Sequence, residues 1–84
     1  MKKVLFENRC SWVWIDPSRE ACKARGYAPR QIVFRGGDIG VVVGVGPATI
    51  NGKEVDVVWC LFNKDNGKVR YLPPSQCRCQ KKLL

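Results

Sequence analysis

Histidine is absent from this 84-residue chain. Its absence removes the commonest general base and the commonest metal ligand that proteins use near neutral pH. A cysteine nucleophile would then need a carboxylate or a lysine to activate it, and no spacing in the chain nominates such a pair. Asp38 follows two glycines, a position that favours a turn-stabilising role over a catalytic one. We therefore expect no enzymatic activity and no cofactor.

Long apolar runs are also missing. No stretch approaches the ~20 apolar residues of a transmembrane helix, and residues 4–6 are too short an apolar run for a signal peptide. We expect no membrane insertion and an intracellular protein, either cytoplasmic or nuclear. The oligomeric state is left open.

Acidic residues are few, with 7 Asp plus Glu against 15 Lys plus Arg and a formal net charge of +8. This excess favours an acidic partner, such as nucleic acid or an acidic peptide. The alternative is that the charge only keeps a small domain soluble.

The five cysteines form an odd number, which is most simply explained by a reducing compartment. An all-cysteine zinc site is conceivable because Cys77 and Cys79 share one strand face, with Cys10 and Cys22 as further ligands. The C-x-C spacing is not the usual C-x2-C, and buried thiols are the favoured interpretation. We expect no metal, and the zinc alternative stays open.

The first 30 residues predict a strand and a helix. Trp12 and Trp14 alternate with Val13 and Ile15, which is typical of a half-buried strand, and the two tryptophans belong either to the core or to a groove wall. A strand or a frayed end precedes them at 3–6. A cap at residue 16, proline at 17 and glycine at 26 then predict a short helix over 17–25.

The rest of the chain predicts strands joined by glycine-dependent turns. The expected strands are 31–34, 39–45, 54–62, 69–72 and 77–80, with Asn-Gly turns within 47–53 and 63–68 and a helical turn at 75–76. Glycines within 39–46 indicate a bulge or a sharp bend. A phosphate-binding loop is disfavoured because neither GxxxxGK[ST] nor GxGxxG is present. These signals predict a single, mainly β domain with a strongly curved antiparallel sheet of five or six short strands.

Short motifs between residues 31 and 80 resemble those of SH3-like β-barrel modules. GDIGVV at 37–42 is similar to the G-D-x-G-x-V core of KOW-type and mind-bomb-type modules. VW at 58–59, DNG at 65–67 and Tyr71 resemble the mind-bomb-type pattern alone. The resemblance implies a small SH3-like barrel over 31–80. From the residues themselves we expect an N-terminal strand and helix extension over 1–30 and a loose tail at 81–84. The helix is no part of a minimal barrel, and a Tudor-type methyl-lysine cage would need more aromatics than these motifs supply.

The resemblance implies a non-catalytic interaction module. We expect a protein segment, acidic in character, to bind the barrel loops and nearby aromatics, where tyrosine and tryptophan give rigid contact area and arginine gives directional hydrogen bonds. An RNA- or DNA-binding barrel is the first alternative, and a structural subunit of a larger assembly is the second. The candidate ligand-binding residues are Arg35, Asp38, Trp59, Phe62, Lys64, Lys68, Arg70 and Tyr71.

Overall fold

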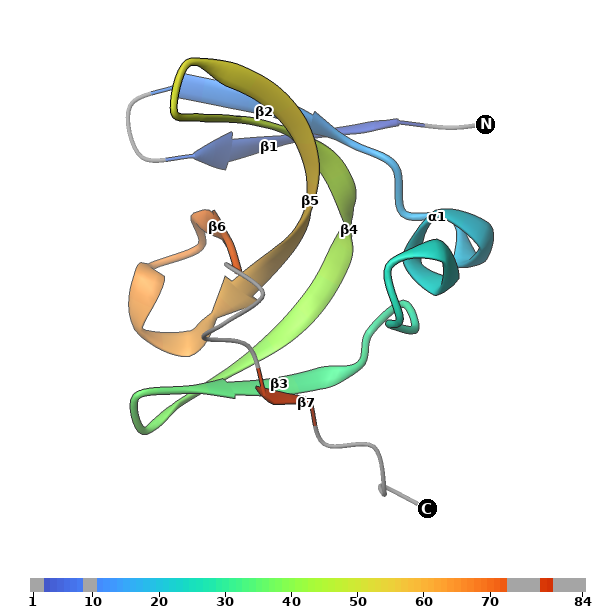
Figure 1. Cartoon of the computed structure of the whole chain (residues 1–84). Coiled ribbons are helices and arrows are strands. Elements are labelled where there is room, and N and C mark those ends of the chain that lie inside the picture. Colours follow the sequence, from blue (N-terminus) through green and yellow to red (C-terminus); the bar gives the residue numbers. More distant parts are fainter. Residues whose placement is uncertain (1–2, 9–10, 73–77, 80–84) are drawn as a thin grey trace.

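The computed structural model describes residues 3–8 and 11–72 and the backbone of 78–79, and these segments are mainly β (Figure 1). In chain order the elements are β1 (Val4–Asn8), β2 (Ser11–Ile15), α1 (Arg19–Ala24), β3 (Ile32–Arg35), β4 (Asp38–Ile50), β5 (Lys53–Phe62), the 3₁₀ turn η1 (Asn63–Asp65), β6 (Val69–Tyr71) and β7 (Arg78–Cys79). Strands β1 and β2 form a hairpin of their own, and the other five form one antiparallel sheet in the order β6-β5-β4-β3-β7. This sheet curls like a half-barrel, which confirms the predicted fold class.

The long β4–β5 hairpin sets the curvature of the molecule. Its register shifts between Val42 and Gly44, which is the bulge that the glycines predicted. At this bend β2 crosses β4, because Asp16 and Val45 exchange backbone hydrogen bonds of 2.7 and 3.0 Å. A Cβ on Gly44 would overlap the backbone oxygen of Asp16, so glycine is required for the crossing.

The sequence prediction was wrong about where β4 ends. Residues 47–53 were expected to form a loop, but β4 continues to Ile50, and the turn is confined to Asn51 and Gly52, with φ of 52° and 78°. Ala48 and Ile50 pack in the apolar cluster beneath the β1–β2 hairpin, so burial extends the strand past Pro47.

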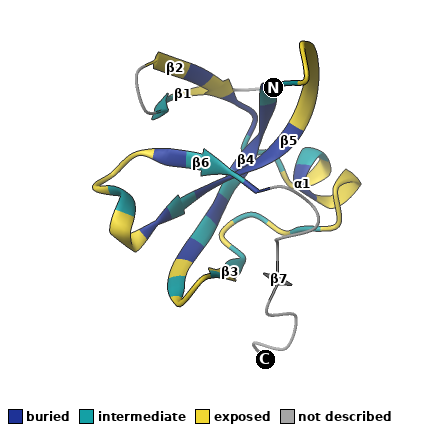
Figure 2. Ribbon diagram, turned by 60° about the vertical axis from the view of Figure 1, so that its left-hand side comes forward, coloured by how far each residue is buried: buried dark blue, intermediate teal, exposed yellow. Residues whose placement is uncertain are grey.

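In the second half of β5, at residues 57–62, both faces of the strand are covered, and alternate residues join different clusters. Val58, Cys60 and Phe62 pack with Cys22, Val33, Val42 and Leu72, while Val57 and Trp59 pack with Val13, Ile15, Ala48 and Val69. The strand predicted at 54–62 is therefore confirmed as β5. Figure 2 shows burial along the middle of β4 and β5 and exposure at the hairpin tips.

The helix is shorter than predicted and begins later. It starts after Ser18, whose side chain accepts a hydrogen bond from the backbone N–H of Ala21 at 3.2 Å. Asp16 was expected to cap it, but its backbone is held by β4 and its carboxylate accepts the N–H of Ser18 at 2.9 Å. Strand β7 pairs with β3 as the expected closing strand. The helical turn at 75–76 and the tail at 81–84 lie outside the described residues.

Candidate functional site

Five of the eight residues selected from the sequence line one depression of about 350 Å³. We call it the basic pocket. It is bounded by Arg35, Gly36, Asp38, Phe62, Lys64, Asp65 and Arg70. The strands and turns that supply these residues are far apart in sequence, and the β3–β4 turn and the turn after β5 bring them together.

Asp38 holds the two turns of the basic pocket to each other. One carboxylate oxygen accepts the backbone N–H of Ile39 at 2.8 Å, and the other accepts the backbone N–H of Lys64 at 3.1 Å. The second bond joins the β3–β4 turn to η1. Asp38 is therefore a turn-stabilising residue, as its sequence context indicated, and it also positions Lys64.

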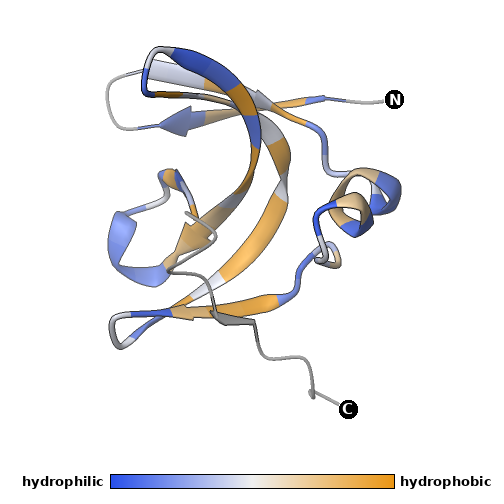
Figure 3. Cartoon of the chain, viewed as in Figure 1, coloured by the Kyte–Doolittle hydropathy of each residue, from blue (hydrophilic) through white to orange (hydrophobic). Residues whose placement is uncertain are grey.

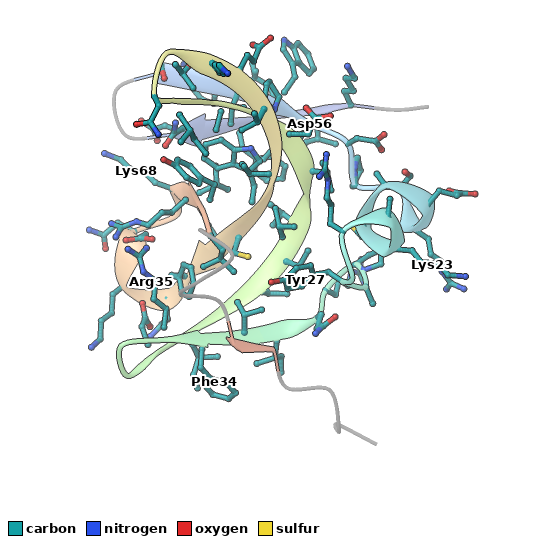
Figure 4. The ribbon with its side chains drawn as sticks, in the orientation of Figure 1. Lys23, Tyr27, Phe34, Arg35, Asp56 and Lys68 are labelled. Atoms are coloured by element: carbon teal, nitrogen blue, oxygen red, sulfur yellow. The ribbon has the colours of Figure 1, made fainter. Side chains whose placement is uncertain are left out.

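Asp65 and two arginines form the polar floor of the basic pocket. Nη2 of Arg70 donates to Oδ1 of Asp65 at 2.9 Å, and the two side chains are 37% and 15% exposed. Nη1 of Arg35 and Oδ2 of Asp65 are buried and have no hydrogen-bond partner. Figure 4 shows Arg35 extending from the end of β3 toward the turn that carries Asp65. Unpaired buried polar atoms are rare, and two of the three such side-chain atoms among the described residues belong to residues that line the basic pocket.

Three of the selected residues lie elsewhere. Trp59 was expected at the binding surface, but it is 1% exposed and packs edge-on against Tyr71 with ring centroids 5.3 Å apart. Trp59 belongs to the core because its strand face is covered by the β1–β2 hairpin, which the local pattern did not show. Lys68 is exposed, does not line the basic pocket, and extends away from Arg35 (Figure 4).

An apolar groove of about 610 Å³ adjoins the basic pocket and shares Phe62 with it. The remaining lining residues are Arg30, Ile32, Ile39, Gly40, Val41, Leu61, Asn63 and Gly67, among which Arg30 is the single charged side chain. Figure 3 shows the hydrophobic character of β3 and of the neighbouring parts of β4 and β5. Ile39, on the rim, is 53% exposed. The site thus combines a cationic pocket with an apolar surface.

Sequence reasoning did not select Trp12 and Trp14, which are 63% and 54% exposed. Leu5 lies opposite Trp14 in the β1–β2 register and is also exposed, so the three residues form an aromatic and apolar surface, the hairpin face. The alternation at 11–15 placed both tryptophans on one side of the strand. It could not show which side the rest of the molecule covers.

The described residues offer little for metal or covalent chemistry. They contain no group of three or more cysteine, aspartate or glutamate side chains that could hold a metal ion. Cys10, Cys77 and the side chain of Cys79 lie outside them, so the zinc alternative is not addressed. Burial, with a smaller contribution from Asp16, raises the pKa of the Cys22 thiol and keeps it protonated. No helix in this part of the chain is long and apolar enough to cross a membrane.

Comparisons of the chain with protein-family models, with curated proteins and with solved structures found no match.

Proposed function

We propose that the chain is a non-catalytic interaction module that binds an acidic protein segment. An acidic side chain of the segment enters the basic pocket, where Arg35, Lys64 and Arg70 provide positive charge. A neighbouring apolar side chain lies in the apolar groove. The observation that carries this proposal is the direct junction of the two surfaces at Phe62, which matches a ligand that is charged and apolar at adjacent positions.

The strand order supports an SH3-like architecture for residues 31–80. Strands β3 to β6 follow one another as a meander, and the last strand, β7, returns to pair with β3. This order fits a small SH3-like barrel, the fold that the resemblance of the motifs implies. A non-catalytic role is supported by the protonated, buried Cys22 and by the use of both oxygens of Asp38 in backbone hydrogen bonds.

A nucleic-acid partner is the second candidate, and the hairpin face favours it. Exposed aromatic rings stack on bases, and the formal charge of +8 would attract phosphates. A protein segment is preferred because the apolar groove has one cation, Arg30, among nine lining residues. The third candidate is a structural subunit of a larger assembly that pairs through β6, which is the end strand of the sheet that the described residues form.

The test is a titration of the chain, followed by amide NMR shifts, with a peptide that alternates glutamate and leucine. A glutamine–leucine peptide and a single-stranded RNA serve as comparison ligands. We expect the acidic peptide to bind and to shift amide signals around η1 and the β3–β4 turn. Arg35→Ala should weaken binding about tenfold or more, because a charged hydrogen bond is lost. Arg19→Ala, which removes the same charge from an exposed position in α1, should leave binding unchanged.

Two results would overturn this assignment. Equal binding of the glutamine and glutamate peptides would show that charge plays no part. RNA binding whose logarithmic salt slope is about −3 to −5, without peptide binding, would make nucleic acid the partner.

A further inference from the structure

We propose that in the free protein the carboxylate of Asp65 occupies the position that an oxyanion of the ligand takes when it binds. Ligand binding then displaces Asp65 from Arg70. The inference rests on the proposed function of the basic pocket and adds the chemistry of the recognised group. That group is an oxyanion carried by a protein segment, either a carboxylate or a phosphate monoester.

The two carboxylates in the basic pocket are used differently. Both oxygens of Asp38 accept backbone N–H groups, so this side chain is committed to joining the two turns. Asp65 uses only Oδ1, which accepts Nη2 of Arg70 at 2.9 Å, while its buried Oδ2 has no partner. The side chain of Asp38 thus has a structural role. Asp65 makes a single side-chain hydrogen bond, which an incoming anion can replace.

Arg35 has unused hydrogen-bonding capacity in the same pocket. Its buried Nη1 has no partner although a carboxylate and a second guanidinium line the same cavity. Guanidinium groups prefer to hold carboxylate or phosphate through paired N–H donors. An oxyanion shared between Arg35 and Arg70 would satisfy donors that Asp65 leaves unpaired.

The charge balance defines the class of ligand. Three cationic side chains and two carboxylates line the pocket, which leaves one net positive charge while Asp65 is in place. Displacement of Asp65 leaves two net positive charges, which suits a carboxylate and suits the dianion of a phosphate monoester better.

Displacement requires only a local change. Asp65 is the last residue of a single 3₁₀ turn, followed by Asn66 in the left-handed conformation with φ of 53°. One backbone hydrogen bond, from the N–H of Lys68 to the carbonyl oxygen of Asp65 at 3.0 Å, closes this turn. Side-chain rotation at Asp65 would release Arg70 and leave that backbone bond intact.

The experiment compares wild type with Asp65→Asn, using the glutamate–leucine peptide and the same peptide with phosphoserine in place of glutamate. Asparagine keeps the size of the side chain and removes its charge. We expect Asp65→Asn to bind both peptides about fivefold more tightly, because the internal competitor is lost. Glu54→Gln, which removes the same charge from the exposed start of β5, should bind as wild type does. Thermal unfolding of each variant verifies that it is folded.

The outcomes separate this inference from the proposed function. If Asp65→Asn binds as wild type does or more weakly, while Arg35→Ala abolishes binding, the pocket is the site and Asp65 is not a competitor. If neither wild type nor Asp65→Asn binds either peptide, both proposals fail. Tighter binding by Asp65→Asn supports the inference. The peptide that binds more tightly then identifies the recognised oxyanion as a carboxylate or a phosphate.

Discussion

The hairpin junction and the basic pocket are held together by different physical means. At the hairpin junction, where Ile15 and Asp16 cross Gly44 and Val45, backbone meets backbone with no room for an added side chain. At the basic pocket, the turns are joined by hydrogen bonds to Asp38, and polar atoms remain unpaired. Close packing of the backbone therefore fixes the fold at the hairpin junction, whereas hydrogen bonds to one carboxylate hold the basic pocket and leave some of its polar atoms unpaired.

The largest expected effect is at the hairpin junction. Gly44→Ala would force the new methyl group against the Asp16 backbone and the Ile15 side chain. We expect the free energy of unfolding to fall by about 3 kcal/mol or more, enough to unfold much of a chain this small. Urea denaturation followed by tryptophan fluorescence measures it.

Gly52→Ala is the matched control for this substitution. Gly52 also has a positive φ, of 78°, but an added Cβ would meet nothing within 4 Å. Its cost should be about 1 kcal/mol, from backbone strain alone. Equal losses for the two variants would contradict close packing as the cause.

The next largest effect is a difference in stability between substitutions of a buried and an exposed tryptophan. Trp59→Phe removes part of a ring that is 1% exposed and should lower the free energy of unfolding by about 1–3 kcal/mol. Trp12→Phe changes a ring that is 63% exposed and should alter it by no more than about 0.5 kcal/mol. Thermal or urea unfolding of both variants checks the contrast, and a larger loss at Trp12 would show that the hairpin face is covered in solution.

A smaller effect is expected at the basic pocket. Asp38→Asn removes one acceptor oxygen and should lower the free energy of unfolding by about 1 kcal/mol. Hydrogen exchange should become faster at the amide of Lys64 and stay unchanged at the amides of Asp16 and Val45. Asp56→Asn is the control, because Asp56 is exposed on β5 and does not line the basic pocket (Figure 4). Faster exchange at the hairpin junction would show that the two regions are coupled.

The smallest effect is a dependence on pH at the hairpin junction. The hydrogen bond from the backbone N–H of Ser18, and then that from its side chain, lower the pKa of Asp16 below its ordinary value of 3.8. A lowered pKa stabilises the fold above pH 3.8, and this contribution is lost as the pH falls through the folded-state pKa. Asp16→Asn should therefore flatten the decline in urea midpoint below pH 3.8. If the urea midpoint of Asp16→Asn fell as steeply as that of wild type, the loss of stability at low pH would come from other carboxylates.

Much of the fold was predictable because its signals are local. Alternation identified the strand at 11–15, and the two Asn-Gly pairs identified the turns between β4 and β5 and between β5 and β6. The bulge at Gly44 followed from glycine within an apolar strand. The candidate site was predictable only in part: Arg35, Asp38, Lys64 and Arg70 meet in one pocket, whereas Trp59 is buried and Trp12 and Trp14 are exposed.

The sequence by itself determined the class of fold, the positions of most strands and turns, and the positive charge, since each depends on residue type and short-range spacing. Only the tertiary structure decided which face of each strand is covered. Alternation assigns side chains to two faces, but burial depends on what packs against each face, and here the β1–β2 hairpin covers Trp59 and leaves its own tryptophans outside. The tertiary structure also brought Arg35 and Asp38 next to Lys64, Asp65 and Arg70, because the hydrogen bond from the backbone N–H of Lys64 to Asp38 joins two turns that lie 26 residues apart in the sequence.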